Sequence, residues 1–242
     1  LTDPDPNMIG VHNPSVFPSM LPSGLIIGGL NQSRMVPVPT LIPAKMTVGV
    51  DVFCVEEDRF GNRSDARIAG RAPTSFWLTK DRNLAQEKIR RRLPSSDQIT
   101  VWGEIRDLSR RLQNGSEHAL DRLISSAPPA DSPAEINPAL WGGAQAYALE
   151  AEGSLLMVEK LPNSHDAKML ALATAASYMR LIPEANLFES KESVARYVKR
   201  IVERSFDTFP SEDFSYTETR AKFDEIIHFE FTNFQNRVLL SA

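Results

Sequence analysis

The chain has 242 residues, of which 42% are hydrophobic and 24% are charged. These proportions are those of an ordinary globular protein with a sizeable core, in one large domain or two small ones. The formal net charge of -4 argues against a protein that coats nucleic acid through bulk positive charge. A single cysteine excludes an intrachain disulfide framework, and no apolar run is long enough to span a membrane.

Proline dominates residues 1–45, which hold eight prolines and four charged side chains. Proline at this density rules out a long helix and keeps the preceding residues extended, so we expect an extended N-terminal arm. Its apolar side chains must be covered, either by the body of the same chain or by a neighbouring copy. We favour the neighbouring copy, because a monomer seldom needs so long an irregular segment. No signal-peptide pattern is present.

The next two segments change character from strand to helix. Alternating apolar residues over 46–55 and short runs at 65–72 and 74–79 predict a small antiparallel sheet or hairpin over 46–79. Helical periodicity follows over 80–126. Asp81 can cap a first helix there, Ser95 and Gln98 form a capping-box pair before a second helix that ends near Leu112, and Ser116 can cap a third.

Residues 127–138 are rich in proline and read as a linker. Beyond it, residues 139–235 are predicted to form a second helical subdomain, and residues 236–242 an apolar tail. The expected helices cover 139–152, the stretch from Ser164 to Pro183, the stretch after Ser190, and the stretch after Thr217; residues 154–161 fit a strand or a continued helix. The predicted fold class is α+β, mostly α.

Few residues suggest catalysis. Cys54 lies in an apolar strand pattern and is expected to be a buried structural thiol. Glu225 and His228 have the Glu-x-x-His spacing of di-iron helix bundles, but no second copy of the motif is present, so no metal site is expected. No nucleotide-binding loop or nucleophile elbow is found. The sequence therefore predicts neither an enzyme nor a cofactor.

Basic residues cluster on two predicted helix faces, where arginine can grip phosphate and stack on bases. Such faces are also common simply because they are solvated, and that alternative stays open. The candidate nucleic-acid-binding residues are Arg82, Lys88, Arg90, Arg91, Arg92, Arg106, Arg110, Arg111, Arg196, Lys199 and Arg200.

The arm, the tail and the local arginine concentration together favour a self-assembling subunit: a viral coat or nucleocapsid protein that packs single-stranded RNA without reading its sequence. Its partners would be copies of itself, through the arm and the tail, and its place the virion or the cytoplasm. Two alternatives remain: an accessory or scaffold subunit of a large hetero-complex, and a soluble enzyme with a dispersed site.

Overall fold

The structure, a computed structural model, describes residues 7–37, 39–57, 64–72, 96–112, 117–126, 146–151, 154–160, 168–174, 177, 185–188, 207–210, 217–223, 226–232 and 237–241. The chain divides into two compact units, Leu1–Pro128 and Pro129–Ala242. The division falls inside the proline-rich segment 127–138. Each unit is described by itself below.

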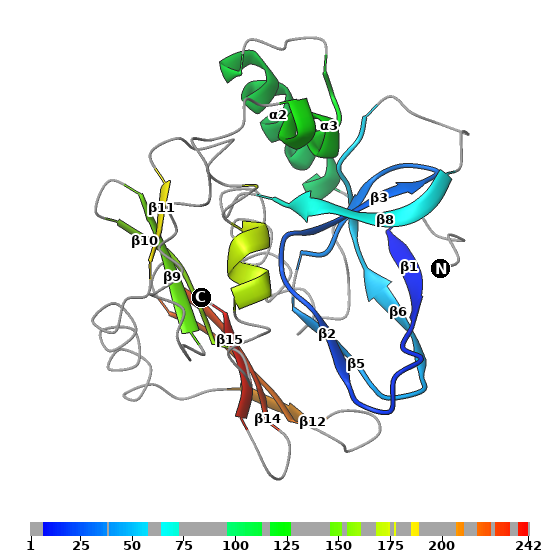
Figure 1. Cartoon of the computed structure of the whole chain (residues 1–242), viewed down its shortest axis with the longest axis vertical. Coiled ribbons are helices and arrows are strands. Elements are labelled where there is room, and N and C mark those ends of the chain that lie inside the picture. The colour runs from blue at the N-terminus through cyan, green and yellow to red at the C-terminus, as the bar shows by residue number, and fades with distance from the viewer. Residues whose placement is uncertain are drawn as a thin grey trace. The chain divides into compact units, whose positions relative to one another are not determined.

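The first unit is built mainly of strands, all paired antiparallel (Figure 1). One pair joins β1 to β6, a second joins β2 to β5, and a four-stranded sheet has the order β7-β4-β3-β8. The strands are β1 (Met8–His12), β2 (Ser19–Leu21), β3 (Leu25–Leu30), β4 (Arg34–Met35), β5 (Thr40–Ile42), β6 (Thr47–Asp51), β7 (Phe53–Cys54) and β8 (Ser64–Arg71).

The predicted N-terminal arm is wrong, because residues 8–42 contribute five of these strands. Proline prevents helix formation, but it is compatible with strands when it lies between them. The prolines here do lie in the connections: Pro14 and Pro18 separate β1 from β2, and Pro37 separates β4 from β5. The predicted hairpin over 46–79 is also corrected, since β6, β7 and β8 each pair with a strand from this N-terminal segment.

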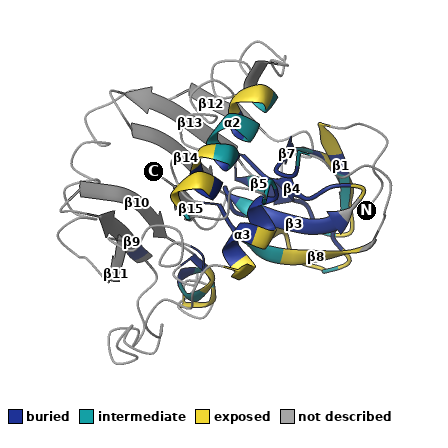
Figure 2. Cartoon of the chain, turned by 90° about the horizontal axis from the view of Figure 1, so that it is seen from above, coloured by how far each residue is buried: buried dark blue, intermediate teal, exposed yellow. Residues whose placement is uncertain are grey.

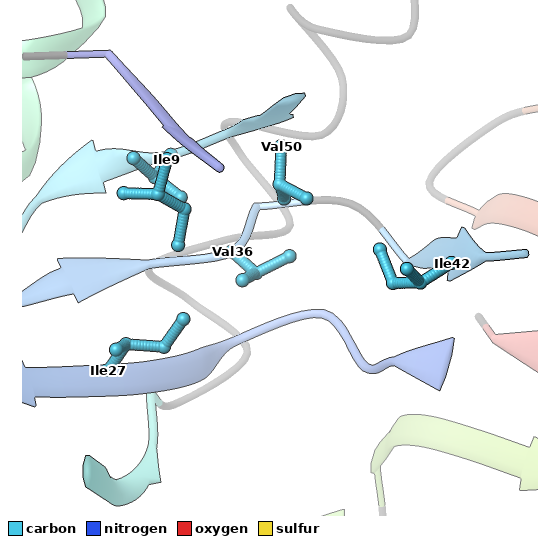
Figure 3. Close-up of a cluster of buried hydrophobic side chains, with 6 residues drawn as sticks. Ile9, Ile27, Val36, Ile42 and Val50 are labelled. Carbon is cyan, nitrogen blue, oxygen red and sulfur yellow. The ribbon is translucent and has the colours of Figure 1, made fainter. Parts of the chain in front are cut away.

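The core of the first unit lies between these strands (Figure 3). β-Branched side chains from strands distant in sequence converge there, and burying one contributes about 1.5–3 kcal/mol. The apolar N-terminal side chains of this cluster are thus covered by their own unit, which was the alternative we did not favour. The cluster comprises Ile9, Ile27, Val36, Ile42, Val50 and Val52.

The described residues of the first unit also include the helices α2 (Ser96–Arg111) and α3 (Leu120–Ser126). They agree with the second and third helices predicted for the 80–126 segment. Val101, Ile105 and Leu108 form the buried stripe of α2, and its opposite side is exposed (Figure 2). α2 packs on β7, and α3 packs on β8. The predicted helix after Asp81 lies outside the described residues.

The second unit contains a seven-stranded antiparallel sheet with the order β11-β9-β10-β15-β14-β13-β12. A helix over 168–174 is joined to the sheet by the Tyr147 hydroxyl, which lies 3.2 Å from Thr174 Oγ1. The strands are β9 (Ala146–Ala151), β10 (Ser154–Lys160), β11 (Ala185–Phe188), β12 (Asp207–Pro210), β13 (Thr217–Phe223), β14 (Ile226–Thr232) and β15 (Arg237–Ser241).

The mostly helical fold class is therefore wrong, since the described part of the chain is rich in strands. The sharpest case is the helix predicted after Thr217, where the structure has the paired strands β13 and β14. Ile226, Ile227 and Phe231 fit a helical stripe, yet β-branched and aromatic residues favour strands. The end of the predicted helix at 139–152 is β9, and the predicted tail contains β15. The helix predicted after Ser190 lies outside the described residues.

Candidate functional site

A buried polar centre lies where the two helices meet the four-stranded sheet of the first unit. Glu56 is 3% exposed, and its carboxylate accepts hydrogen bonds from the Ser33 backbone N–H and from Arg122 Nη2, both at 3.0 Å. Its backbone carbonyl accepts from Gln32 Nε2 at 3.1 Å and from the Cys54 thiol at 2.9 Å. Burying a carboxylate is costly unless its oxygens are paired, and both oxygens of Glu56 are paired.

Cys54 and Gln98 join β7 to the start of α2. The Cys54 backbone N–H donates to Gln98 Oε1 at 2.8 Å, and Gln98 Nε2 donates to the Cys54 carbonyl at 2.7 Å. The Gln98 amide thus bonds to this edge of β7 as a neighbouring strand would. Ser95, the other residue of the expected capping box, lies outside the described residues.

Burial raises the pKa of the Cys54 thiol above its usual range. The hydrogen bond to the Glu56 backbone and the positive charge of Arg34 oppose this shift without cancelling it. The reactive form of a cysteine is its thiolate, so Cys54 is held in its unreactive form. The expectation that Cys54 is buried is confirmed.

The ion pairs around this centre connect the helices to the sheet. Arg106 of α2 pairs with Glu57 at 2.5 Å, and Arg122 of α3 pairs with both Glu56 and Glu117. Antiparallel backbone pairing of residues 118–120 with 55–57 runs beside them. All these partners belong to the same unit, so the centre is suited to fixing α2 and α3 on the sheet.

A second feature is the pair of loops between β1 and β2 and between β5 and β6, which we call the tip (residues 13–18 and 43–46). Asn13 is buried at its base. Its Nδ2 donates to the carbonyls of Phe17 (2.8 Å), Ile42 (3.0 Å) and Pro43 (3.2 Å). Its Oδ1 accepts from the Ser15 N–H at 3.0 Å. One side chain therefore fixes both loops against each other.

Backbone contacts add to this rigidity. The Asn13 N–H donates to the Met46 carbonyl at 2.9 Å, and the Lys45 N–H donates to the Ser15 carbonyl at 3.1 Å. Lys45 Nζ donates to the Pro14 carbonyl at 2.6 Å. Lys45 has a φ of 60°, a left-handed conformation that is uncommon outside glycine. The loops adjoin at one end of the first unit (Figure 1).

The tip exposes large apolar side chains despite this rigidity. Phe17 is 72% exposed, Val16 is 67% exposed and Met46 is 43% exposed. Aromatic and apolar groups held on a fixed backbone are the usual anchors of protein interfaces, because little conformational entropy is lost when they are buried. The sequence offered one signal for them, the flanking prolines Pro14 and Pro18, which we interpreted as part of an arm.

Three of the predicted nucleic-acid-binding residues lie in the described part of the chain. Arg106 is paired with Glu57, Arg110 pairs with Asp107 one turn earlier in α2, and Arg111 is exposed. Two of the three positive charges are therefore balanced by acidic neighbours. The following predicted residues lie outside the described residues: Arg82, Lys88, Arg90, Arg91, Arg92, Arg196, Lys199 and Arg200.

No group of three metal-ligating side chains occurs among the residues that the structure describes. His228 belongs to β14, a strand and not a helix, and Glu225 lies outside the described residues. Within the same described residues, no helix is long and apolar enough to cross a membrane.

The fold and these two features define an α+β protein of two strand-rich units, with a polar centre used for packing and an exposed apolar tip. The chain belongs to the ARPP-1 family, described as the ARG and Rhodanese-Phosphatase-superfamily-associated Protein domain, whose model matches residues 4–230. No curated protein and no solved structure shows a significant match.

The prediction of a viral coat or nucleocapsid protein is wrong. The family match assigns nearly the whole chain to a family associated with rhodanese-phosphatase superfamily proteins. The features that favoured self-assembly have another explanation as well, because the supposed arm and tail contribute strands to the sheets of their own units.

Proposed function

We propose that this chain is a non-catalytic accessory protein that binds a protein of the rhodanese-phosphatase superfamily, and that the tip is the surface it uses. The family description supplies the class of partner. The observation that carries the proposal is the 72% exposure of Phe17 on a loop that the Asn13 side chain holds in place. Exposed aromatic side chains on preorganised loops bind with little entropic cost.

The chemistry of the buried centre supports a non-catalytic role. Cys54 is the chain's single cysteine, and burial keeps its thiol protonated. The Glu56 carboxylate is bound to the Ser33 backbone N–H and to Arg122, so it connects α3 to the sheet. The Cys54 thiol donates to the Glu56 carbonyl within the same segment.

Isothermal titration tests the proposal, with the full chain and a purified rhodanese-phosphatase superfamily protein from the same organism. Removing a central aromatic anchor typically costs 2 kcal/mol or more, so Phe17→Asp should weaken binding at least about 30-fold. Ile99→Asp is the matched control, because Ile99 is 67% exposed but lies on α2. Its binding should equal that of the wild type.

Two results would contradict the proposal. If wild-type chain gives no binding heat with such partners, the assigned partner class is wrong. If Phe17→Asp and Ile99→Asp both bind like the wild type, the partner is right but the tip is not the surface. Circular dichroism of each variant distinguishes lost binding from lost folding.

A further inference from the structure

The two edges of the four-stranded sheet in the first unit differ in their protection. At the β7 edge, the Gln98 amide takes up both the N–H and the carbonyl of Cys54. The chain just beyond, residues 55–57, pairs with residues 118–120. Unprotected edges invite pairing with another chain, and side-chain or backbone cover is the usual protection. The β7 edge is thus closed.

The β8 edge is open along four residues. Among the described strands, β8 pairs with β3 alone. Residues 65–68 are all exposed, and Ile68 is 75% exposed although its register partner Ile27 is in the core. The register with β3 also shifts between Ser64 and Arg67. Such an irregularity increases the strand's twist and leaves part of its backbone without a ladder partner.

The charges of this stretch are self-complementary. Asp65 and Arg67 flank Ala66. In an antiparallel pair of two identical strands with its two-fold axis at Ala66, Asp65 of each copy lies opposite Arg67 of the other. An axis at Asp65 or at Arg67 would set a charge opposite its own copy, which is unfavourable. The Arg67 side chain is 64% exposed, and it also forms an ion pair of 3.8 Å with the buried Asp121.

We propose that the β8 edge binds a second copy of this chain, as an antiparallel strand pair centred on Ala66. Strand addition of this kind takes its affinity from backbone hydrogen bonds and its register from the side chains. A two-fold dimer uses the same patch twice, so it leaves no free edge and does not polymerise. In Figure 1, β8 lies between the helices and the tip and takes no part in the tip, so dimer formation leaves the tip accessible.

Sedimentation velocity over a range of concentrations tests this with three chains: the wild type, Asp65→Arg and Arg67→Asp. The wild type should dimerise. Each variant replaces two attractive cross-strand pairs by two repulsive ones, so each should dimerise at least about tenfold more weakly. The decisive sample is the mixture of the two variants, because each supplies the charges that the other lacks. The mixture should form a heterodimer of wild-type affinity.

Three outcomes overturn the proposal. In the first outcome, the wild type stays monomeric at its highest soluble concentration, which means that the register shift protects this edge. In the second outcome, both variants dimerise like the wild type, which places the interface elsewhere. In the third outcome, the mixture does not associate although both variants keep the wild-type circular dichroism spectrum. None of these outcomes depends on the partner proposed for the tip, since no second protein is present.

Discussion

Replacing Asn13 by alanine should loosen the tip and destabilise the first unit. The side chain donates to three carbonyls and accepts from the Ser15 N–H and from Ser19 Oγ. A net hydrogen bond contributes about 1 kcal/mol, and a buried carbonyl left without a partner costs about 1–3 kcal/mol. The two Nδ2 hydrogens serve three acceptors, so the full sum is not lost. We expect the free energy of unfolding to fall by about 2–4 kcal/mol.

Asn13→Asp tests the donor contacts separately, because aspartate keeps the shape and the Oδ1 acceptor but loses the amide hydrogens. Its second carboxylate oxygen would face three carbonyl oxygens, so the loss should be at least as large as with alanine. The control is Arg111→Ala. Arg111 is exposed at the end of α2, and substitutions at such positions usually change stability by less than about 0.5 kcal/mol.

Hydrogen exchange of the full chain in increasing urea measures these differences at the tip itself. Faster exchange of the Ser15 and Phe17 amides in both Asn13 variants, with a midpoint shifted to lower urea, is the expected result. A loss of less than about 1 kcal/mol for Asn13→Ala, or unchanged tip exchange, would refute the reasoning that Asn13 fixes the two loops.

Three other changes test the buried centre and the packing of the sheet. Glu56→Ala leaves the buried Ser33 N–H without its acceptor and removes one of the two carboxylates that pair with Arg122. It should lower the free energy of unfolding by about 2–4 kcal/mol in urea titrations. Gly28→Ala places a Cβ 3.0 Å from the Ala69 Cβ of β8, so thermal unfolding should show that the free energy of unfolding falls by about 1–3 kcal/mol. In Gly49→Ala the new Cβ meets the flexible Met8 side chain of β1, so the free energy of unfolding should fall by less than about 1 kcal/mol. Because the pKa of Cys54 is raised, the folded chain keeps a thiol proton that the unfolded chain loses near pH 9.0. The free energy of unfolding should therefore fall as the pH rises above that value. The contribution of Cys54 to this fall should be absent in Cys54→Ala. An unchanged pH slope in that variant would be evidence against a buried thiol.

Local patterns predicted the helices of the first unit better than its strands. The apolar spacing of Ile99, Trp102, Ile105 and Leu108 predicts the helix α2, in which Ile105 and Leu108 are buried. Ile99 fits the same spacing but is 67% exposed, and Val101 is buried instead. Strands depend on partners elsewhere in the chain, which periodicity does not reveal. Residues 8–42 resembled an irregular arm because their prolines and short apolar runs carry no long repeat, although they form strands whose partners reach as far as β8.

The second unit illustrates an ambiguity of short apolar patterns. Ile226, Ile227 and Phe231 satisfy a helical stripe, while Ile227, Phe229 and Phe231 satisfy strand alternation equally well. Composition decided between them, since β-branched and aromatic residues pack well on a pleated sheet. The tip could not be predicted at all, because Phe17 reads like the buried apolar residues around it. What leaves it exposed is the Asn13 contact to Ile42 and Pro43, which are 29 and 30 residues away.

Site-specific photo-crosslinking tests most directly whether the tip contacts the partner. A photoreactive phenylalanine analogue is placed at position 17 in one chain and at position 99 in another, and each is irradiated with the rhodanese-phosphatase superfamily protein. We expect a crosslinked product of combined mass from position 17 and none from position 99. Equal crosslinking from both positions, or crosslinking from position 99 alone, would contradict the tip as the binding surface.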